Sequence, residues 1–473
     1  MIDIATDAIA RLRADPDTTV ITPQDGDFDT ARELFYGGLD RRPAVIARPT
    51  GAAAVAAVLA VARETGLPLA VRSGGHGLLG HASIADGIVL DLRDLRSLDI
   101  DAADQTAWAG AGLTAGEYTA AAAAHGLATG FGDTGSVGIG GLTVGGGVGF
   151  LSRKHGLTID QLLAAEIVTA DGTVRVVDAD TDPDLFWAIR GGGGNVGVVT
   201  RFKFRLHELP SVVAGMLILP ASPEVVHGFA AAADAAPEEL TTIANIMASA
   251  PPIPFLPAEV HGKPIVMGLM AYAGDTAAGE QALDPFRSLA TPLFTDVGPK
   301  PYADLFPPEE EVANPAAAVE TLFLDRVDHR TASTIMACLD RTPAPMAVVQ
   351  LRVLGGAVSR VPGDATAYAH RDRRIMVNVA AMDFGAADAP PDATDHRPWV
   401  TATAQALAPD GSGRYVNFVG SEGHDQARAA FPGSTWDRLA RIKQRYDPDN
   451  LLRHNVNVPP TGATATEAGA RTA

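Results

Sequence analysis

The sequence contains one cysteine, Cys338, among 473 residues. A single cysteine excludes an intramolecular disulfide and any metal site built from several thiolates. No stretch approaches the roughly 18 consecutive apolar residues that a membrane-spanning helix needs. The first residues, MIDIATDAIARLRADPDTT, include acidic side chains and lack the apolar centre of a secretory signal. These absences predict a cytoplasmic protein with no membrane segment.

Basic residues are outnumbered: 37 lysines and arginines stand against 56 aspartates and glutamates, which gives a formal net charge of −19. Nucleic acids and anionic membranes both need clustered positive charge, so neither is an expected partner. His81 follows His76 closely, but no further ligand stands at a matching spacing, so no metal site is predicted. The length is too great for one hydrophobic core and predicts two domains.

Glycine is abundant, with 49 residues, and much of it lies in three loops at 74–77, 135–149 and 191–197. The first loop is part of RSGGH at 72–76, which follows an apolar run at 67–71 that predicts a buried strand. Glycine permits positive φ and close approach of a ligand, and successive backbone N–H groups can bind an anion. Each loop alone could be only a turn with unusual dihedral angles. Three such loops in one half of the chain indicate one large ligand lying across several loop ends.

The remaining pattern alternates strands and helices. A strand at 42–49, a helix at 51–65 and the strand at 67–71 have the spacing of a βαβ unit. Asp171-Gly172, between two predicted strands, is typical of a type I′ hairpin turn. After about residue 210 the glycine loops end, and strands and helices alternate between proline-rich loops. GRYVNFVG at 413–420 is predicted to be a strand.

Four segments resemble a known family. RSGGHG, followed by a strand ending in Asp-Leu, resembles the flavin-attachment loop of the FAD-linked oxidases of the vanillyl-alcohol oxidase superfamily. VGIGGLTVGGGVGFLSRKHGLTID, DLFWAIRGGGGNVGVVTRFKFRL and YDPDNLLRHNVNVPP resemble its other flavin-contacting segments. The likeness is greatest to the berberine-bridge-enzyme-like and 6-hydroxynicotine-oxidase-like branch. It covers about 40–205 and 410–460, and in between it is best at 354–362.

The resemblance implies a two-domain α+β fold of the PCMH-type FAD-binding class, with a central substrate domain built on an antiparallel sheet. Both chain ends would form the FAD-binding domain, from residues 1–208 and 411–460. The substrate-binding domain would occupy 209–410. The tail at 461–473, rich in small and polar residues, is expected to be disordered.

The resemblance also implies the cofactor, FAD, bound covalently through His76. Members with two covalent links carry a cysteine where this chain has Thr134, and a threonine cannot form that thioether, so we expect a single link. Gly141 and Gly146 are expected where the backbone meets FAD. Asp160 is implied as a hydrogen-bond partner of FAD, and the alternative for it is a capping role in a turn. The implied cofactor-binding residues are Arg72, Ser73, Gly74, Gly75, His76, Gly77, Thr134, Gly138, Gly141, Gly146, Asp160, Gly197, Val199, Asn455 and Asn457.

The substrate side is less sharply defined. In alcohol-oxidising relatives a Tyr-x-Asn-Tyr strand ends in a catalytic tyrosine base, whereas this chain reads Tyr415-Val416-Asn417-Phe418. Alternation puts Tyr415 and Asn417 on one face, and likewise Gln350 and Arg352. These four side chains are the candidate catalytic residues. The alternatives are packing against the sheet for Tyr415, flavin contact without catalysis for Asn417, and a solvated polar face for Gln350 and Arg352 and also for Asn378.

The resemblance implies an FAD-dependent oxidoreductase, an oxidase that transfers hydride from a small organic substrate to FAD with O2 as acceptor. The substrate could be an amine, an alcohol or a natural-product intermediate of secondary metabolism. The missing tyrosine base favours an amine, because an amine can lose hydride without prior O–H deprotonation. The alternatives are an oxidative cyclase or dehydrogenase of a natural-product pathway, or a flavin-binding protein without turnover. A homodimer is possible.

Overall fold

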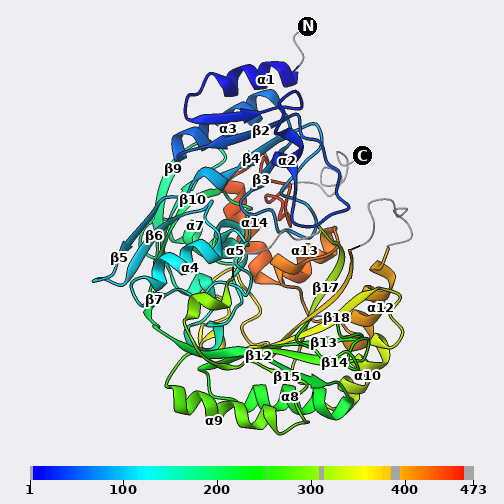
Figure 1. Cartoon of the computed structure of the whole chain (residues 1–473). Coiled ribbons are helices and arrows are strands. Elements are labelled where there is room, and N and C mark those ends of the chain that lie inside the picture. Colours follow the sequence, from blue (N-terminus) through cyan, green and yellow to red (C-terminus); the bar gives the residue numbers. More distant parts are fainter. Residues whose placement is uncertain (1–3, 253, 308–313, 385–394, 463–473) are drawn as a thin grey trace.

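The computed structural model describes residues 4–252, 254–307, 314–384 and 395–462. Figure 1 shows two parts: the N-terminal and C-terminal segments of the described chain form one, and a large sheet with its own helices forms the other. None of the described helices is long and apolar enough to cross a membrane.

The first sheet carries the RSGGH turn at the end of one strand. Its order is β1 (Thr18–Ile21), β2 (Val45–Pro49), β4 (Ile88–Asp91), β3 (Leu69–Arg72), and both β2 and β3 run parallel to β4. Helix α3 (Ala52–Thr65) joins β2 to β3, which confirms the predicted βαβ crossover. It ends at Gly66 in the left-handed conformation, with φ 70°.

The second sheet is antiparallel, in the order β5 (Leu98–Asp101), β6 (Thr106–Gly110), β10 (Val198–Arg205), β8 (Leu162–Val168), β9 (Val174–Asp178). The hairpin between β8 and β9 is not of type I′. That turn needs positive φ at both central residues, and of this pair only Gly172 has it. Asp171 instead accepts hydrogen bonds from Thr169 and Thr173 across a longer loop.

Short elements complete this part of the molecule. The N-terminal segments contribute α1 (Ile4–Arg13), α2 (Phe28–Arg32), α4 (Ala115–Ala123), α5 (Ile139–Gly145), α6 (Ser152–His155), α7 (Pro183–Ala188) and the pair β7 (Leu127–Ala128) and β11 (His207–Glu208). The C-terminal segment adds α13 (His424–Ala430) and α14 (Ser434–Tyr446). Leu439 and Ile442 of α14 belong to the same buried cluster as Val55 of α3 and Val198 of β10. One core therefore joins the two chain ends.

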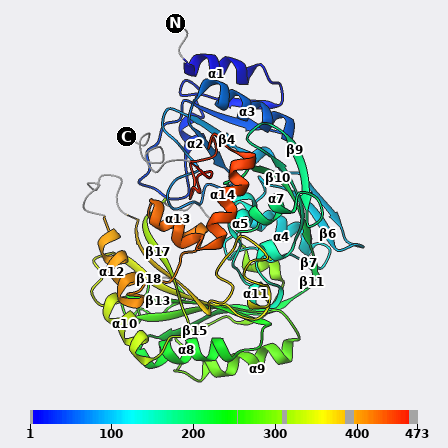
Figure 2. The same ribbon diagram turned by 180° about the vertical axis from the view of Figure 1, so that it is seen from behind.

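The large sheet is fully antiparallel, in the order β15 (Phe294–Thr295), β12 (Val212–Pro220), β14 (Ile265–Tyr272), β13 (Leu240–Met247), β18 (Met346–Val353), β19 (Ile375–Asp383), β17 (Ala316–Leu324), with β16 (Gly298–Lys300) also paired to β12. Figures 1 and 2 show helices on its outer face. These are α8 (Pro223–Ala235), α9 (Thr276–Arg287), α10 (His329–Leu339) and α12 (Arg397–Leu407). The predicted fold class is confirmed; the domain boundaries stay a prediction.

The alternation of the strands decides which side chains face the other part of the molecule. On β18, Val349 and Leu351 pack against the helices, so Gln350 and Arg352 point the opposite way. Cys338 is buried on α10.

One predicted strand is wrong. Residues 413–420 form a 3₁₀ turn at Val416–Phe418 and pair with no sheet. Contacts with distant segments hold this turn: Thr321 on β17 donates to the Phe418 carbonyl at 2.7 Å, and Asn417 donates to the Leu142 carbonyl at 3.1 Å.

Candidate active site

A cavity of about 610 Å³ lies between the glycine loops and the open face of the large sheet. Five segments from both parts of the chain line it. They are the RSGGH loop with its continuation to Ala82, the region 132–148, the loop 193–199, the turn 415–419 and the segment 452–456. From the sheet come Gln350, Arg352, Asn378 and Met382. The three glycine loops therefore meet at one site, as their number in the sequence predicted.

The RSGGH loop is held by backbone contacts. The Ser73 hydroxyl donates to the Ala111 carbonyl at 2.7 Å. Gly74 and Gly138 lie so close that a Cβ on either would overlap the backbone of the other. Gly75 has φ 77°, which favours glycine. At Gly77 an added Cβ would meet no atom within 4 Å, so this backbone borders open space in the cavity wall.

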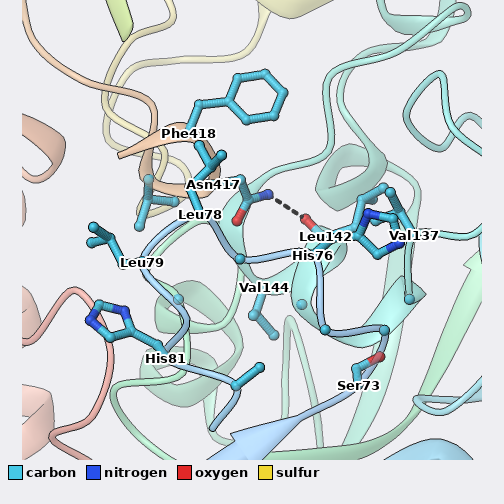
Figure 3. A pocket seen from close by; sticks show the side chains of 18 of the residues that line it. Ser73, His76, Leu78, Leu79, His81, Val137, Leu142, Val144, Asn417 and Phe418 are labelled. Atoms are coloured by element: carbon cyan, nitrogen blue, oxygen red, sulfur yellow. Dashed lines mark hydrogen bonds between the residues drawn. The ribbon is translucent and has the colours of Figure 1, made fainter. Parts of the chain in front are cut away.

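His76 stands on this rigid loop and lines the cavity (Figure 3). Its ring stacks on Phe35, with centroids 4.1 Å apart and an interplanar angle of 22°. Its Nε2 lies 3.0 Å from the Ser136 hydroxyl. Stacking and hydrogen bonding together fix the direction of the imidazole.

The glycines of the second loop have different neighbours. Gly138 and Gly141 line the cavity, and an added Cβ at Gly141 would meet no atom within 4 Å. Gly146 does not line it. Its φ is 135°, and a Cβ there would lie 3.2 Å from the rings of Tyr368 and Tyr415. The need for glycine at 146 thus comes from backbone conformation and protein packing, which differs from the predicted cofactor contact.

Tyr415 and Asn417 lie together although the strand predicted for them is absent. The Tyr415 hydroxyl accepts hydrogen bonds from the backbone N–H of Gly147 at 2.9 Å and from Asn417 Nδ2 at 3.0 Å. These two donors use both acceptor positions of a neutral tyrosine hydroxyl. Burial raises the pKa of Tyr415, against the lowering effect of the Gly147 and Asn417 hydrogen bonds. At neutral pH the group is therefore a hydroxyl that can still donate, and no proton acceptor. In Figure 3 a dashed line joins Asn417 to the Leu142 carbonyl.

Arg352 reaches from the sheet to the glycine region. Its Nη2 donates to Asp133 Oδ2 at 2.7 Å, and its Nε donates to Gln350 Oε1 at 2.7 Å. Gln350 donates in turn to Asn245 Oδ1 at 2.8 Å. The guanidinium lies 5.4 Å from the ring centroid of Phe418. Asp133 thus neutralises the only arginine that lines the cavity among the described residues, and no described lysine lines it.

Of the other predicted cofactor residues, Thr134, Gly197, Val199 and Asn455 line the cavity, whereas Arg72, Asp160 and Asn457 do not. Arg72 is 1% exposed and donates to Asp91 at 2.7 Å, so its charge is used inside the first sheet. Asp160 forms a two-point ion pair with Arg371 and accepts from the Leu157 N–H, the capping role named as its alternative.

Sequence reasoning missed Asp133, Asn245 and the buried pair Lys443–Asp447. Asp133 stands directly before Thr134, a predicted cofactor-binding residue, so its position in the sequence pointed to the site. Its ion-pair partner, Arg352, lies 219 residues away and could not be found from the local sequence. Asn245 could have been found only from the pairing of β13 with β18.

The cavity fits an extended cofactor with phosphates. Its wall offers bare backbone at Gly77 and Gly141, where a side chain would intrude, and helix α5 begins at the cavity with Gly138 as its N-cap. Asn455 Oδ1 is buried without a hydrogen-bond partner among the described residues.

Comparison with known proteins agrees with this geometry. The FAD binding domain family matches residues 43–178, and the berberine and berberine-like family matches residues 414–459. (R)-6-hydroxynicotine oxidase of Paenarthrobacter nicotinovorans is 32% identical over 464 residues, covering 94% of this chain and 97% of that one.

Solved structures give the same result. The crystal structure of 6-hydroxy-D-nicotine oxidase from Arthrobacter nicotinovorans aligns with a TM-score of 0.81 and 28% identity, covering 93% of this chain and 97% of that one. Xylooligosaccharide oxidase from Myceliophthora thermophila aligns with a TM-score of 0.84 over 98% and 100% of the two chains, at 23% identity, and so supports the fold alone.

The chain belongs to the FAD-linked oxidoreductases of the vanillyl-alcohol oxidase superfamily, in the branch of the berberine-bridge-like and 6-hydroxynicotine-oxidase-like enzymes. It is an FAD-dependent oxidoreductase, and the resemblance in its glycine loops is thereby confirmed.

Proposed function

We propose that FAD lies in this cavity and is joined through its 8α-methyl carbon to the imidazole of His76. The observation that carries the proposal is the fixed His76 ring at the cavity wall, between Phe35 and Ser136. A preorientated imidazole suits a bond to one defined carbon. Because residue 134 is a threonine, the proposed link is the only covalent one.

A flavin held by the glycine loops that line the cavity would supply a two-electron acceptor for hydride, with O2 as the proposed final oxidant and hydrogen peroxide as its product. The side chains of this protein orient the substrate and exclude water. Gln350 and Arg352 form a fixed polar wall, because their mutual hydrogen bond and the Asp133 ion pair leave them little freedom. Tyr415 retains one hydroxyl proton to donate toward the cavity.

A proton acceptor is missing at the position where alcohol-oxidising relatives have one. Phe418 cannot take a proton, and both acceptor positions of the Tyr415 hydroxyl are in use. An alcohol loses its O–H proton as hydride leaves, and a positioned base typically contributes about 10²–10⁴-fold to the rate. An amine needs only to be neutral. We therefore propose an amine oxidase, with (R)-6-hydroxynicotine oxidase, 32% identical, as supporting likeness.

The covalent link is tested with purified protein precipitated in acid. The yellow colour should stay with the polypeptide, and mass spectrometry should find one flavin on the peptide that contains His76. His76→Ala should release the flavin into the supernatant. Ser136→Ala, which removes only the hydroxyl beside Nε2, is the matched control and should retain some covalent flavin. A colourless pellet from the unaltered protein refutes the link.

The oxidase assignment is tested by peroxide formation across cyclic amines, alcohols and oligosaccharides in air-saturated buffer. Turnover of amines with a rate that rises as the amine loses its proton supports the proposal. Turnover restricted to alcohols refutes its amine part.

We also propose a cytoplasmic location, a role in secondary metabolism and a homodimer. Cell fractionation tests the location, inspection of the neighbouring genes tests the metabolic role, and sedimentation tests the homodimer.

A further inference from the structure

One row of polar side chains crosses the large sheet above the cavity. The strand pairing places Asn245 of β13 opposite Gln350 of β18, Gln350 opposite Asn378 of β19, and Asn378 opposite Thr321 of β17. All four point to the same face, because residues paired across strands share a face. Gln350 and Asn378 line the cavity.

Three members of this row are hydrogen-bonded within the protein. Asn245 Oδ1 accepts from Gln350, Gln350 Oε1 accepts from Arg352, and Thr321 donates to the Phe418 carbonyl. Asn378 differs: its amide has no hydrogen bond within the described part of the chain, and its Oδ1 is buried without a partner. A buried carbonyl oxygen without a partner costs free energy. Because an amide can turn, and Asn378 lines the cavity, a ligand there could pair with this group and remove that cost.

The charges at this site cancel. Arg352 and Asp133, 2.7 Å apart, form a closed pair with side chains 6% and 18% exposed. Around His81 and His454, the Glu422 carboxylate lies 3.6 Å from His81 and the Arg41 guanidinium lies 3.4 Å from His454, one charge of each sign. Burial lowers the pKa of His454 to about 4, so this ring is neutral at pH 7. Leu78, Met382 and Phe418 supply apolar lining on this side, and the Tyr415 hydroxyl beside them is uncharged. A ligand with a net charge would find no counter-ion here.

From these observations we infer that the cavity selects a neutral, mainly apolar substrate whose single polar group is bound by the Asn378 amide. The inference rests on the proposed function for the flavin but concerns this chain's own charges. Because an amide can turn, Asn378 offers either its N–H or its carbonyl oxygen. For an amine substrate, the neutral form is the one that binds.

The test uses three planar probes of nearly equal shape: benzamide, benzoate and benzamidinium. Calorimetric titration of the flavin-loaded protein at about pH 8, where histidine is ordinarily neutral, gives three dissociation constants. Benzamide should bind at least about tenfold more tightly than either ion. Asn378→Leu should weaken benzamide about five- to tenfold, the value of one neutral hydrogen bond.

Two substitutions should reverse the order by breaking the charge balance. Asp133→Asn leaves Arg352 unpaired, so benzoate should become the tightest probe. Asn378→Asp adds one negative charge, whichever carboxylate Arg352 then contacts, so benzamidinium should become the tightest. The matched control is Asp160→Asn, which breaks the buried Arg371 ion pair away from the cavity and should leave the order unchanged.

Equal or tighter binding of either ion by the unaltered protein overturns the inference, as does an absence of benzamide binding at its solubility limit. An order that neither Asp133→Asn nor Asn378→Asp reverses also overturns it. Acid precipitation and peroxide formation test the proposed function separately, because the dissociation constants of the flavin-loaded protein depend neither on the covalent link nor on turnover.

Discussion

Replacement of one buried lysine should lower the thermal stability of the protein and weaken the packing of two segments that line the cavity. Lys443 of α14 is wholly buried, and its Nζ donates to the carbonyls of Asn195 at 3.0 Å and Leu452 at 2.8 Å. Its charge is balanced by Asp447 at 2.9 Å, also wholly buried. Asp447 accepts in addition from the N–H groups of Leu451 and Leu452. The pair therefore ties α14 to the loop 193–199 and the segment 452–456, which both line the cavity.

The size of the effect follows from burial. Lys443→Met keeps the length of the side chain but leaves the Asp447 carboxylate without a counter-charge, which typically costs about 3–5 kcal/mol. At about 2 °C of melting temperature per kcal/mol for domains of this size, the transition should fall by about 6 °C or more. The double variant Lys443→Met/Asp447→Asn removes both charges and should recover at least half of that loss.

The assay is thermal unfolding of flavin-loaded protein, with flavin content measured for each variant. Lys300→Met is the matched control, because Lys300 and Asp296 have the same spacing in sequence but are 24% and 50% exposed. Such an exposed pair contributes about 0–1 kcal/mol, so this variant should melt within about 2 °C of the unaltered protein. Equal shifts for Lys443→Met and Lys300→Met, or a double variant less stable than Lys443→Met, would refute the reasoning.

Three further predictions concern the site and its pH dependence. Gly141→Ala should lower flavin content without lowering the melting temperature of the flavin-free protein, because its Cβ points into open space; an unchanged flavin content contradicts this. Tyr415→Phe should lower stability by about 1–3 kcal/mol in urea unfolding, because the buried N–H of Gly147 loses its acceptor. Burial lowers the pKa of His155 to about 3 and of His207 to about 4, against an ordinary 6.5. The unfolded chain therefore binds protons that the folded one cannot, and stability should fall as the pH drops from about 6.5 to about 3. The double variant His155→Gln/His207→Gln should lessen that loss in melting curves, while His370 and His454, with pKa values of about 4, still contribute to it. An equally steep loss would contradict the assignment.

Much of the fold was predictable because its signals are local. The apolar run at 67–71 predicted a buried strand, and the structure has β3 at Leu69–Arg72 with Leu69 and Ala70 buried. The glycine loops indicated a large ligand, because glycine marks places where the backbone must approach something closely. What glycine does not tell is which neighbour it approaches. Gly141 borders the cavity, whereas Gly146 packs under tyrosine rings.

The predictions that differ from the structure depend on contacts between distant residues. The sequence at 413–420 has the composition of a strand, yet hydrogen bonds to Leu142 and Thr321 form it into a 3₁₀ turn. The resemblance implied Arg72 as a cofactor-binding residue, but its guanidinium donates to Asp91 and it does not line the cavity. Leu142, Thr321 and Asp91 all lie far along the chain from the residues that they bind, so no local sequence pattern predicts these contacts.

The same long-range contacts explain how the site acquires its chemistry. Four hydrogen bonds that build the cavity wall join residues more than 200 positions apart: Arg352 to Asp133, Asn417 to Leu142, Gly147 to Tyr415, and Lys443 to Asn195. Two of these contacts also decide the chemistry. Asp133 cancels the charge of Arg352, and Gly147, with Asn417, occupies the acceptor positions of Tyr415. A cavity assembled in this way has neither a free cation nor a free base beside Phe418 among its described residues. The selectivity that we propose therefore depends on shape, on the Asn378 amide and on the protonation state of the substrate itself.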